Sequence, residues 1–157
     1  MLERARKIFL DVTLAREGGD PASVPAAELF PDIASNLQAE LVHLGSQGTK
    51  LEFRNLCVRK VELVLVRNFS DNTRDEFTVR ISAHAQRAVR RGGLLISEES
   101  YVTPYSEFWT FGRLDCEWKL KEVQPSSEAE KTIGSENVDE DSSPEQLQWY
   151  YRQPRAV

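Results

Sequence analysis

The stretch that most constrains the fold spans residues 76–123, because its first part alternates apolar and polar side chains. The apolar members are Phe77, Val79, Ile81, Ala83 and Ala85, and the polar members are Thr78, Arg80, Ser82, His84 and Gln86. A period of two is typical of a strand with one buried face and one solvated face. Arg91-Gly92-Gly93 then predicts a hairpin turn, because glycine accepts the positive φ that such turns need.

Two further strands are expected in the same stretch. Residues 94–111 are rich in β-forming side chains and end in the aromatic cluster Phe108-Trp109-Thr110-Phe111, which predicts one returning strand. A turn is expected at residues 112–115. After it, Cys116, Trp118 and Leu120 alternate with charged residues and predict a third strand. Three antiparallel strands with one apolar face need a cover from the rest of the chain.

The N-terminal part of the chain supplies that cover. Residues 2–17 carry the apolar stripe of an amphipathic helix, which Gly18-Gly19 ends. A short helix is expected over residues 25–30 and a longer one from Pro31, a residue tolerated at a first helical position. Residues 51–66 predict a long strand, bent near Cys57, whose apolar side chains on both faces suggest that it is covered twice.

Two ordered elements of this stretch carry a family resemblance: Glu107-Phe108-Trp109-Thr110-Phe111, and Trp118-Lys119-Leu120-Lys121-Glu122-Val123. From about Ala5 to Val123 the chain resembles the C-terminal domain of the Tim-forty-four-like family, named for a membrane-tethering subunit of the mitochondrial inner-membrane import motor. The resemblance implies a nuclear-transport-factor-two-like fold, with helices packed into a cone against a curved sheet. It also implies protein tethering at a membrane rather than catalysis. The resemblance further implies that the protein is located at the cytoplasmic face of a bacterial inner membrane, or in the mitochondrial matrix, and that this chain is held peripherally.

Pattern and resemblance together predict three regions. Residues 1–124 form an α+β, cone-shaped domain in which N-terminal helices pack on a curved antiparallel sheet of about four strands. Residues 125–143 hold six acidic side chains against one lysine, so they carry the whole net charge of −5 and predict an acidic flexible linker. Residues 144–157 predict a C-terminal docking segment with apolar side chains at Leu147, Trp149 and Tyr150. The neutral body argues against a nucleic-acid partner.

The sequence indicates no cofactor, no metal site and no catalytic constellation. His43 lies late in the second predicted helix and His84 on the solvated strand face, and neither belongs to a metal-binding motif. Cys57 and Cys116 lie in predicted strands, where a small buried thiol is typical. An enzyme remains an alternative only through Glu107, if that carboxyl proves buried with a strongly raised pKa.

We therefore expect a non-catalytic module that tethers a membrane lipid or a membrane-bound protein. The alternative is a small-molecule pocket protein, an enzyme among the options, that uses the interior of the cone. The expected ligand-binding cleft is lined by Phe77, Val79, Ile81, Tyr101, Tyr105, Glu107, Trp109 and Trp118, and its alternative is a fully packed core. The expected membrane or partner surface is Arg4, Arg6 and Lys7, against the alternative of an ordinary solvated helix face. A homodimer would use the Leu51–Val66 strand or residues 144–153.

Overall fold

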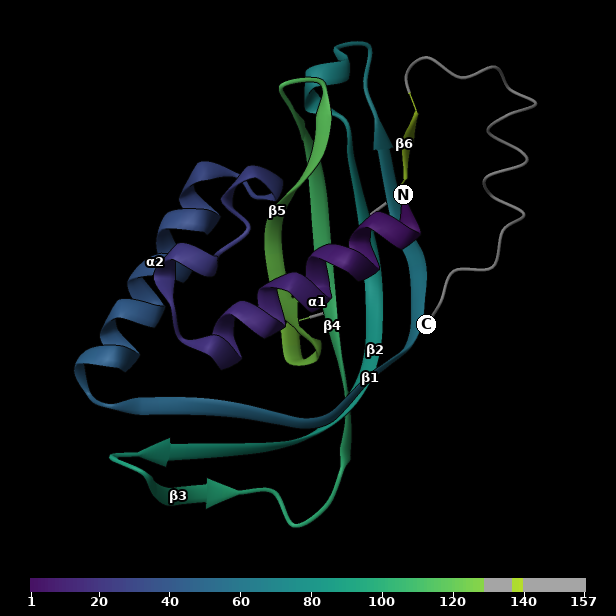
Figure 1. Cartoon of the computed structure of the whole chain (residues 1–157). Coiled ribbons are helices and arrows are strands. Elements are labelled where there is room, and N and C mark those ends of the chain that lie inside the picture. Colours follow the sequence, from purple (N-terminus) through teal and green to yellow (C-terminus); the bar gives the residue numbers. More distant parts are fainter. Residues whose placement is uncertain (129–136, 140–157) are drawn as a thin grey trace.

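The computed structural model describes residues 1–128 and 137–139. The chain order is α1 (Leu2–Gly18), α2 (Pro31–Ser46), β1 (Thr49–Asn68), β2 (Glu76–Arg91), β3 (Leu94–Glu98), β4 (Thr103–Leu114), β5 (Glu117–Pro125) and β6 (Val138–Asp139) (Figure 1). Single 3-10 turns occupy Pro21–Ser23, Ala26–Glu28, Asn72–Arg74 and Ser126–Glu128. The predicted α+β class, with N-terminal helices on an antiparallel sheet, is confirmed.

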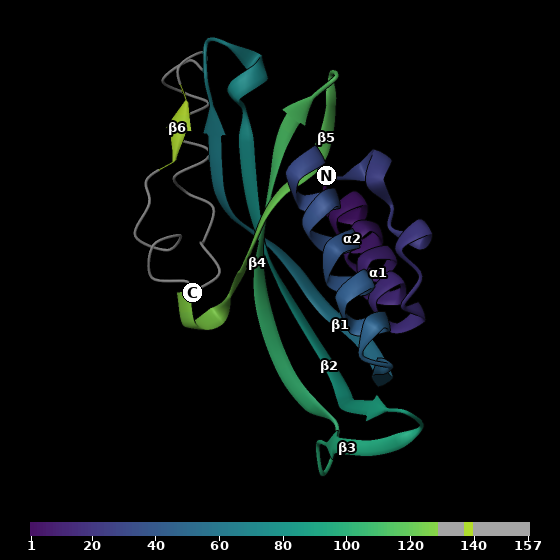
Figure 2. The ribbon, with the colours of Figure 1, turned by 90° about the vertical axis from the view of Figure 1, so that its left-hand side faces the viewer.

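The sheet is open and follows the order β5-β4-β2-β1-β6, with β3 pairing with the far end of β2. Strands β1 to β5 pair antiparallel, and β6 lies parallel to the end of β1. Figure 2 shows both helices on the same face of the sheet. We call this helix-covered face the inner face and the opposite one the outer face.

Helix α1 begins and ends within two residues of its predicted bounds, and α2 begins at the predicted Pro31. Gly19 follows α1 with φ 72°, and its N–H donates to the carbonyl of Ala15. This left-handed cap is a conformation that glycine adopts without strain. Pro31 opens α2 as its first helical residue, where its missing N–H has no intrahelical partner to lose. The helix expected over residues 25–30 is only a single 3-10 turn at Ala26–Glu28.

The sheet curves because β1 carries extra residues that β2 does not match. The β1–β2 register shifts between Arg54 and Cys57, between Val58 and Lys60, and between Leu63 and Leu65. Within the first shift, Asn55 has φ 56°, a left-handed conformation that asparagine tolerates better than most residues. Bulges of this kind bend a strand and increase its twist. The predicted bend near Cys57 is therefore present, and β2, which pairs with β1 along this length, bends with it (Figure 1).

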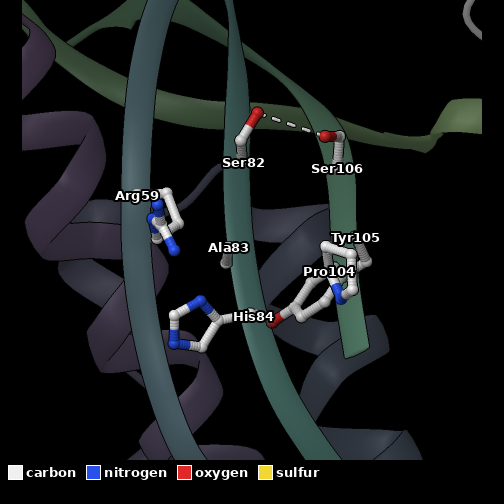
Figure 3. A pocket seen from close by; sticks show the side chains of 7 residues that line it. All are labelled: Arg59, Ser82, Ala83, His84, Pro104, Tyr105 and Ser106. Carbon is white, nitrogen blue, oxygen red and sulfur yellow. Dashed lines mark hydrogen bonds between the residues drawn. The ribbon is translucent and has the colours of Figure 1, made fainter. Parts of the chain in front are cut away.

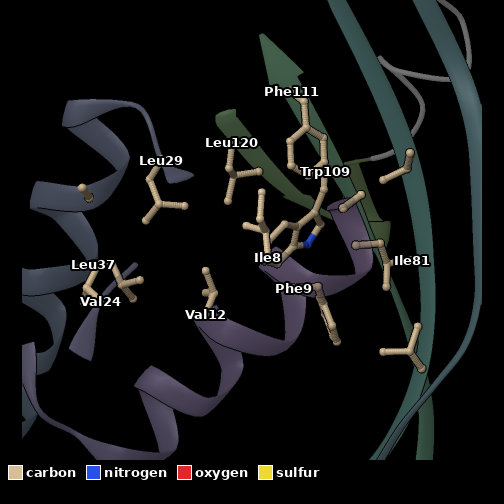
Figure 4. Close-up of a cluster of buried hydrophobic side chains, with 14 of the residues drawn as sticks. Ile8, Phe9, Val12, Val24, Leu29, Leu37, Ile81, Trp109, Phe111 and Leu120 are labelled. Carbon is tan, nitrogen blue, oxygen red and sulfur yellow. The ribbon is translucent and has the colours of Figure 1, made fainter. Parts of the chain in front are cut away.

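The hydrophobic core lies between the helices and the inner face. It is built from the apolar stripes of α1 and α2, the odd-numbered positions 77–83 of β2, and residues of β4 and β5. Figure 4 shows Ile8, Phe9 and Val12 of α1 pointing towards Trp109, Phe111 and Leu120. All five apolar members predicted for the inner face of β2, at positions 77 to 85, are buried. The prediction that the odd-numbered side chains of β2 face the core is therefore confirmed.

Two features of the predicted β-meander need correction. The strand expected over residues 94–111 is divided into β3 and β4, so the antiparallel sheet has five strands in the described part of the chain rather than about four. The turn expected at residues 112–115 lies instead at Asp115 and Cys116, whose φ values are 52° and 62°. Gly112 belongs to β4 and is buried, and a Cβ there would lie 3.1 Å from the Phe30 ring. This glycine is needed for close packing rather than for a turn.

The prediction that both thiols are buried is wrong, because Cys57 and Cys116 are exposed. Cys116 lies in the β4–β5 turn rather than in a strand, and Cys57 pairs in register with His84, a residue of the outer face. The predicted docking segment 144–157 and its dimer contact lie outside the described residues, as does most of the predicted linker. The short strand β6 belongs to the predicted linker, and it pairs with Arg67 and Asn68 at the end of β1.

Candidate functional site

The side chains predicted to line an interior cleft are mostly packed in the core. Phe77, Val79, Ile81 and Trp109 are at most 2% exposed. The Phe77 ring stacks on Phe111 with centroids 5.0 Å apart, and Trp109 meets Phe9 edge to face at 5.2 Å. Such contacts are those of a packed core, in which aromatic pairs add stability beyond their buried area. These contacts support a packing role for the four residues.

The other predicted cleft residues divide between the inner face and the surface. Trp118 is half-buried and meets the Phe77 ring edge to face at 4.9 Å. Tyr101 is 75% exposed in the loop before β4. Tyr105 is half-buried, and this burial raises the pKa of its hydroxyl to about 12. Within the described residues, the predicted set therefore does not converge on one cavity.

Glu107 has a structural contact in the folded chain. Its Oε2 accepts a hydrogen bond from the indole N–H of Trp109 at 2.9 Å, and its side chain is half-buried. A buried indole N–H needs such an acceptor. The contact assigns Glu107 the role of holding Trp109 in place on the inner face.

A small inner cavity of about 170 Å³ lies between the two helices and β5. Its lining includes Val12 of α1, Leu37 of α2 and Leu120 of β5, and Arg16 and Glu40 stand 3.7 Å apart among its polar members. Pockets that hold drug-sized ligands usually measure about 300–1,000 Å³. This cavity is smaller than that range, and none of the residues predicted to line a cleft borders it.

A larger hollow, of about 500 Å³, is open to solvent on the outer face. It is lined by Arg59, Ser82, Ala83, His84, Pro104, Tyr105 and Ser106, and we call it the outer groove (Figure 3). The alternation of β2 places Ser82 and His84 on this face, and the β2–β4 register sets Ser106 opposite Ser82. The two serine hydroxyl oxygens lie 3.2 Å apart and share a hydrogen bond.

Arg59 enters the outer groove because of a bulge in β1. Val58 pairs with Ala83 and Lys60 pairs with Ser82, so Arg59 is an extra residue without a partner on β2. A bulge re-aims side chains relative to regular alternation, and bulges are frequent beside functional sites. Figure 3 shows the Arg59 side chain near the His84 ring, across the strands from the serine pair.

Arg59 lacks the carboxylate partner that other arginines of the sheet have among the described residues. Arg80 lies 2.7 Å from Glu62, and Arg87 lies 2.7 Å from Glu99. Hydrogen bonds from Lys60 and Arg80 lower the pKa of Glu62, and hydrogen bonds from Arg87 lower that of Glu99. Arg59 is exposed, has no such ion pair with any described residue, and lines a groove that contains no carboxylate. Its charge is therefore available to a ligand.

The predicted basic surface on α1 is largely neutralised by neighbouring carboxylates. Arg4 lies 2.8 Å from Glu28, and Lys7 pairs with Asp11 one turn along the helix. The hydrogen bond to Asp11 raises the pKa of Lys7. Arg6 is exposed and makes no ion pair within the described part of the chain. The three residues share one end of α1, but only one of them offers an unpaired charge.

Sequence reasoning placed His84 on the solvated face but missed the groove around it. The available signal was the polar half of the β2 alternation, Ser82 and His84. Neither the bulge at Arg59 nor the register that brings Ser106 to Ser82 can be read from local pattern, since both depend on how three strands pair. Among residues 1–128 and 137–139, no group of three His, Cys, Asp or Glu side chains could hold a metal ion. In the same residues no helix is long and apolar enough to cross a membrane.

A second surface feature is apolar. Leu94, Leu95 and Ile96 of β3 are all exposed, Leu94 at 72%, and exposed Tyr101 and Val102 follow in the next loop. Figure 2 shows β3 at the end of the sheet beyond the helices. Exposed apolar clusters of this kind are frequent at contacts with other proteins.

No family model matches the chain, and no curated protein matches its sequence. Neither comparison therefore supports the Tim-forty-four-like resemblance. Among solved structures, the chain is similar to the intermembrane space region of the chloroplast protein ARC6, with a TM-score of 0.53 and 13% identity over 80% of this chain and 98% of that one. This is a distant structural relationship that concerns the fold alone. A de novo designed β-sheet protein also matches, at a TM-score of 0.38 and 14% identity over 91% of this chain and 93% of that one, which is too weak to support an argument.

Proposed function

We propose that the chain is a non-catalytic binding and tethering module that holds a lipid or protein partner at a membrane surface, and that the outer face of the sheet makes the contact. The observation that carries the proposal is the outer groove, where Arg59 has no carboxylate partner among the described residues and stands beside two serines and a histidine. A cation among hydrogen-bond donors suits an anionic group.

The arrangement of the two faces supports binding outside the core. The inner face packs aromatic rings such as Phe9 against Trp109, and the cavity described beside β5 measures about 170 Å³. No helix of residues 1–128 or 137–139 covers the outer face (Figure 2). The exposed side chains Leu94, Leu95 and Ile96 of β3 would add an apolar contact for a protein partner.

A second candidate function is that of a soluble small-molecule binding protein. One observation favours it, because the outer groove of about 500 Å³ lies within the usual size range of small-molecule sites. Such a protein would bind its ligand equally well without a membrane. The two candidates therefore differ in whether a lipid surface is needed.

Co-sedimentation of the full chain with vesicles tests the proposal. One set of vesicles contains phosphatidylcholine alone, and the other contains added phosphatidylserine. We expect binding to the second set only, weakening as salt is raised, because exposed charge interactions are screened over about 10 Å at 0.1 M salt. Equal binding to both sets, or no binding at low salt, would count against an electrostatic contact with the membrane.

A further inference from the structure

We infer that the outer groove binds a phosphate monoester, with Arg59, Ser82, His84 and Ser106 as its donors. These four side chains come from three neighbouring strands and line one hollow (Figure 3). The inference rests on the proposed function only for the source of the phosphate, a lipid headgroup. The chemistry of the groove itself does not depend on a membrane.

The number and placement of the donors favour phosphate over carboxylate. A carboxylate has two oxygens in one plane, and a single guanidinium can satisfy it by two parallel hydrogen bonds. The outer groove adds hydroxyl and imidazole donors from β2 and β4 to the guanidinium from β1. A phosphate monoester presents three acceptor oxygens in a tetrahedral arrangement and carries up to two charges, so it uses donors from several directions.

The serine pair has donor capacity for a ligand. Ser82 and Ser106 share one hydrogen bond of 3.2 Å, in which one hydroxyl donates and the other accepts. The accepting hydroxyl keeps its own proton, because each serine has one O–H donor and two acceptor lone pairs. An oxygen placed above the pair can therefore accept a hydrogen bond without breaking the contact between the serines.

A neighbouring pair of hydroxyl side chains on the same two strands has a structural role. We call each such hydrogen-bonded pair across β2 and β4 a rung. Thr78 and Thr110 are joined by a 2.8 Å hydrogen bond, and Thr78 is only 2% exposed. Thr78 is therefore closed to solvent, although Thr110 is half-buried, and neither residue lines the outer groove. The serine rung is partly open and borders a hollow, and the adjacent cation has no carboxylate partner in the described chain. The threonine rung therefore provides a matched control.

The first test is an NMR titration of the full chain with inorganic phosphate. We expect saturable shifts of the backbone amides of Arg59, Ser82, His84 and Ser106, and smaller shifts with acetate. Arg59→Gln should weaken phosphate binding at least about tenfold, the scale of one lost hydrogen bond to a charged group. Arg6→Gln removes the same charge from α1 and should leave binding unchanged. Equal losses in the two variants, or no saturable shift in the groove, would overturn the inference.

Variants of the two rungs give a second measurement. Ser82→Ala together with Ser106→Ala should weaken phosphate binding severalfold while the chain stays folded, because both hydroxyls border solvent. Thr78→Val should lower stability and leave phosphate binding as it was. If the serine variant binds phosphate with unchanged affinity, the groove is not the site.

Vesicles then identify the source of the phosphate. Phosphatidic acid carries a phosphate monoester, whereas phosphatidylserine carries a phosphodiester and a carboxylate. If the partner is a lipid, phosphatidic acid vesicles should bind more tightly than phosphatidylserine vesicles and should lose that advantage with Arg59→Gln. Phosphate binding without vesicle binding supports the groove and contradicts the membrane part of the proposed function. Vesicle binding that does not depend on Arg59 contradicts a lipid headgroup as the source of the phosphate and leaves the membrane role standing.

Discussion

Replacing Trp109 with alanine should be among the most destabilising single changes in the described chain. Trp109 is fully buried on β4, its indole meets the Phe9 ring edge to face at 5.2 Å, and its N–H donates to Glu107 at 2.9 Å. Removing a buried tryptophan leaves a cavity and typically costs about 3–5 kcal/mol. An aromatic pair contributes about 0.5–1.5 kcal/mol beyond its buried area, which places the expected loss in the upper part of that range.

Trp118 provides the matched comparison for this prediction. It also meets an aromatic ring edge to face, that of Phe77 at 4.9 Å, and a guanidinium, that of Arg113, lies 5.0 Å from its ring centroid. Trp118 is only half-buried, so its truncation removes less area from the core and leaves a site that water can fill. We expect Trp118→Ala to cost about 1–3 kcal/mol by the scale of buried apolar area.

Urea unfolding followed by far-UV circular dichroism measures both variants. With an m-value close to that of the unsubstituted chain, the shift of the midpoint gives the change in the free energy of unfolding. For a domain of this size, each kcal/mol lowers Tm by about 2–4 °C, so Trp109→Ala should lower it by about 6–20 °C. A loss below about 1 kcal/mol, or a larger loss in Trp118→Ala, would refute the assigned face of β4.

Four further predictions each follow from a single feature of the structure. Cys57 and Cys116 are both exposed, so both should react with a thiol reagent in the folded chain, and protection until unfolding would contradict their placement. Gly112→Ala should lower stability by about 1–2 kcal/mol because its Cβ meets an aromatic ring at 3.1 Å. Gly45→Ala, with open space around it in α2, should raise stability, as helix propensity favours alanine by up to about 1 kcal/mol. Glu62→Gln should remove a stabilisation that is full above the ordinary Glu pKa of 4.5. This stabilisation is lost as pH falls through the lowered folded pKa, so the gap in stability between the two chains should close in acid.

The regular part of the fold could be predicted because local periodicity decides it. The apolar stripe of α1, the glycine after it and the alternation of β2 each depend only on residues close in sequence, and each is found in the structure. The division of residues 94–111 into β3 and β4 could not be predicted in this way. It depends on where β2 bends away from β4, which follows from the bulges in β1.

The errors at the two cysteines have the same origin. Cys116 continues a period-two pattern with Trp118 and Leu120, but its φ of 62° places it in the turn before that strand. Cys57 follows a bulge that shifts its pairing, so the side of the sheet it faces could not be counted from the start of β1. A one-residue slip moves every later side chain of a strand to the opposite face. An alternation pattern counted across such a slip therefore no longer predicts which face of the sheet a side chain occupies.

The position of the candidate site follows from the same division of the two faces. Odd-numbered side chains of β2 from Phe77 to Ala85 fill the core, and a ligand placed there would have to separate packed rings such as Phe9 and Trp109. Even-numbered side chains of β2 face outward, where the bulge adds Arg59 and no helix of the described residues covers the strands. Removing Arg59 should then change binding with little change in stability, because the side chain is exposed and makes no ion pair with the described residues. Truncating Trp109 should instead lower stability and leave phosphate binding by the folded chain unchanged. Separate effects of these two residues on binding and on stability are what distinguishes a site on the outer face from one inside the fold.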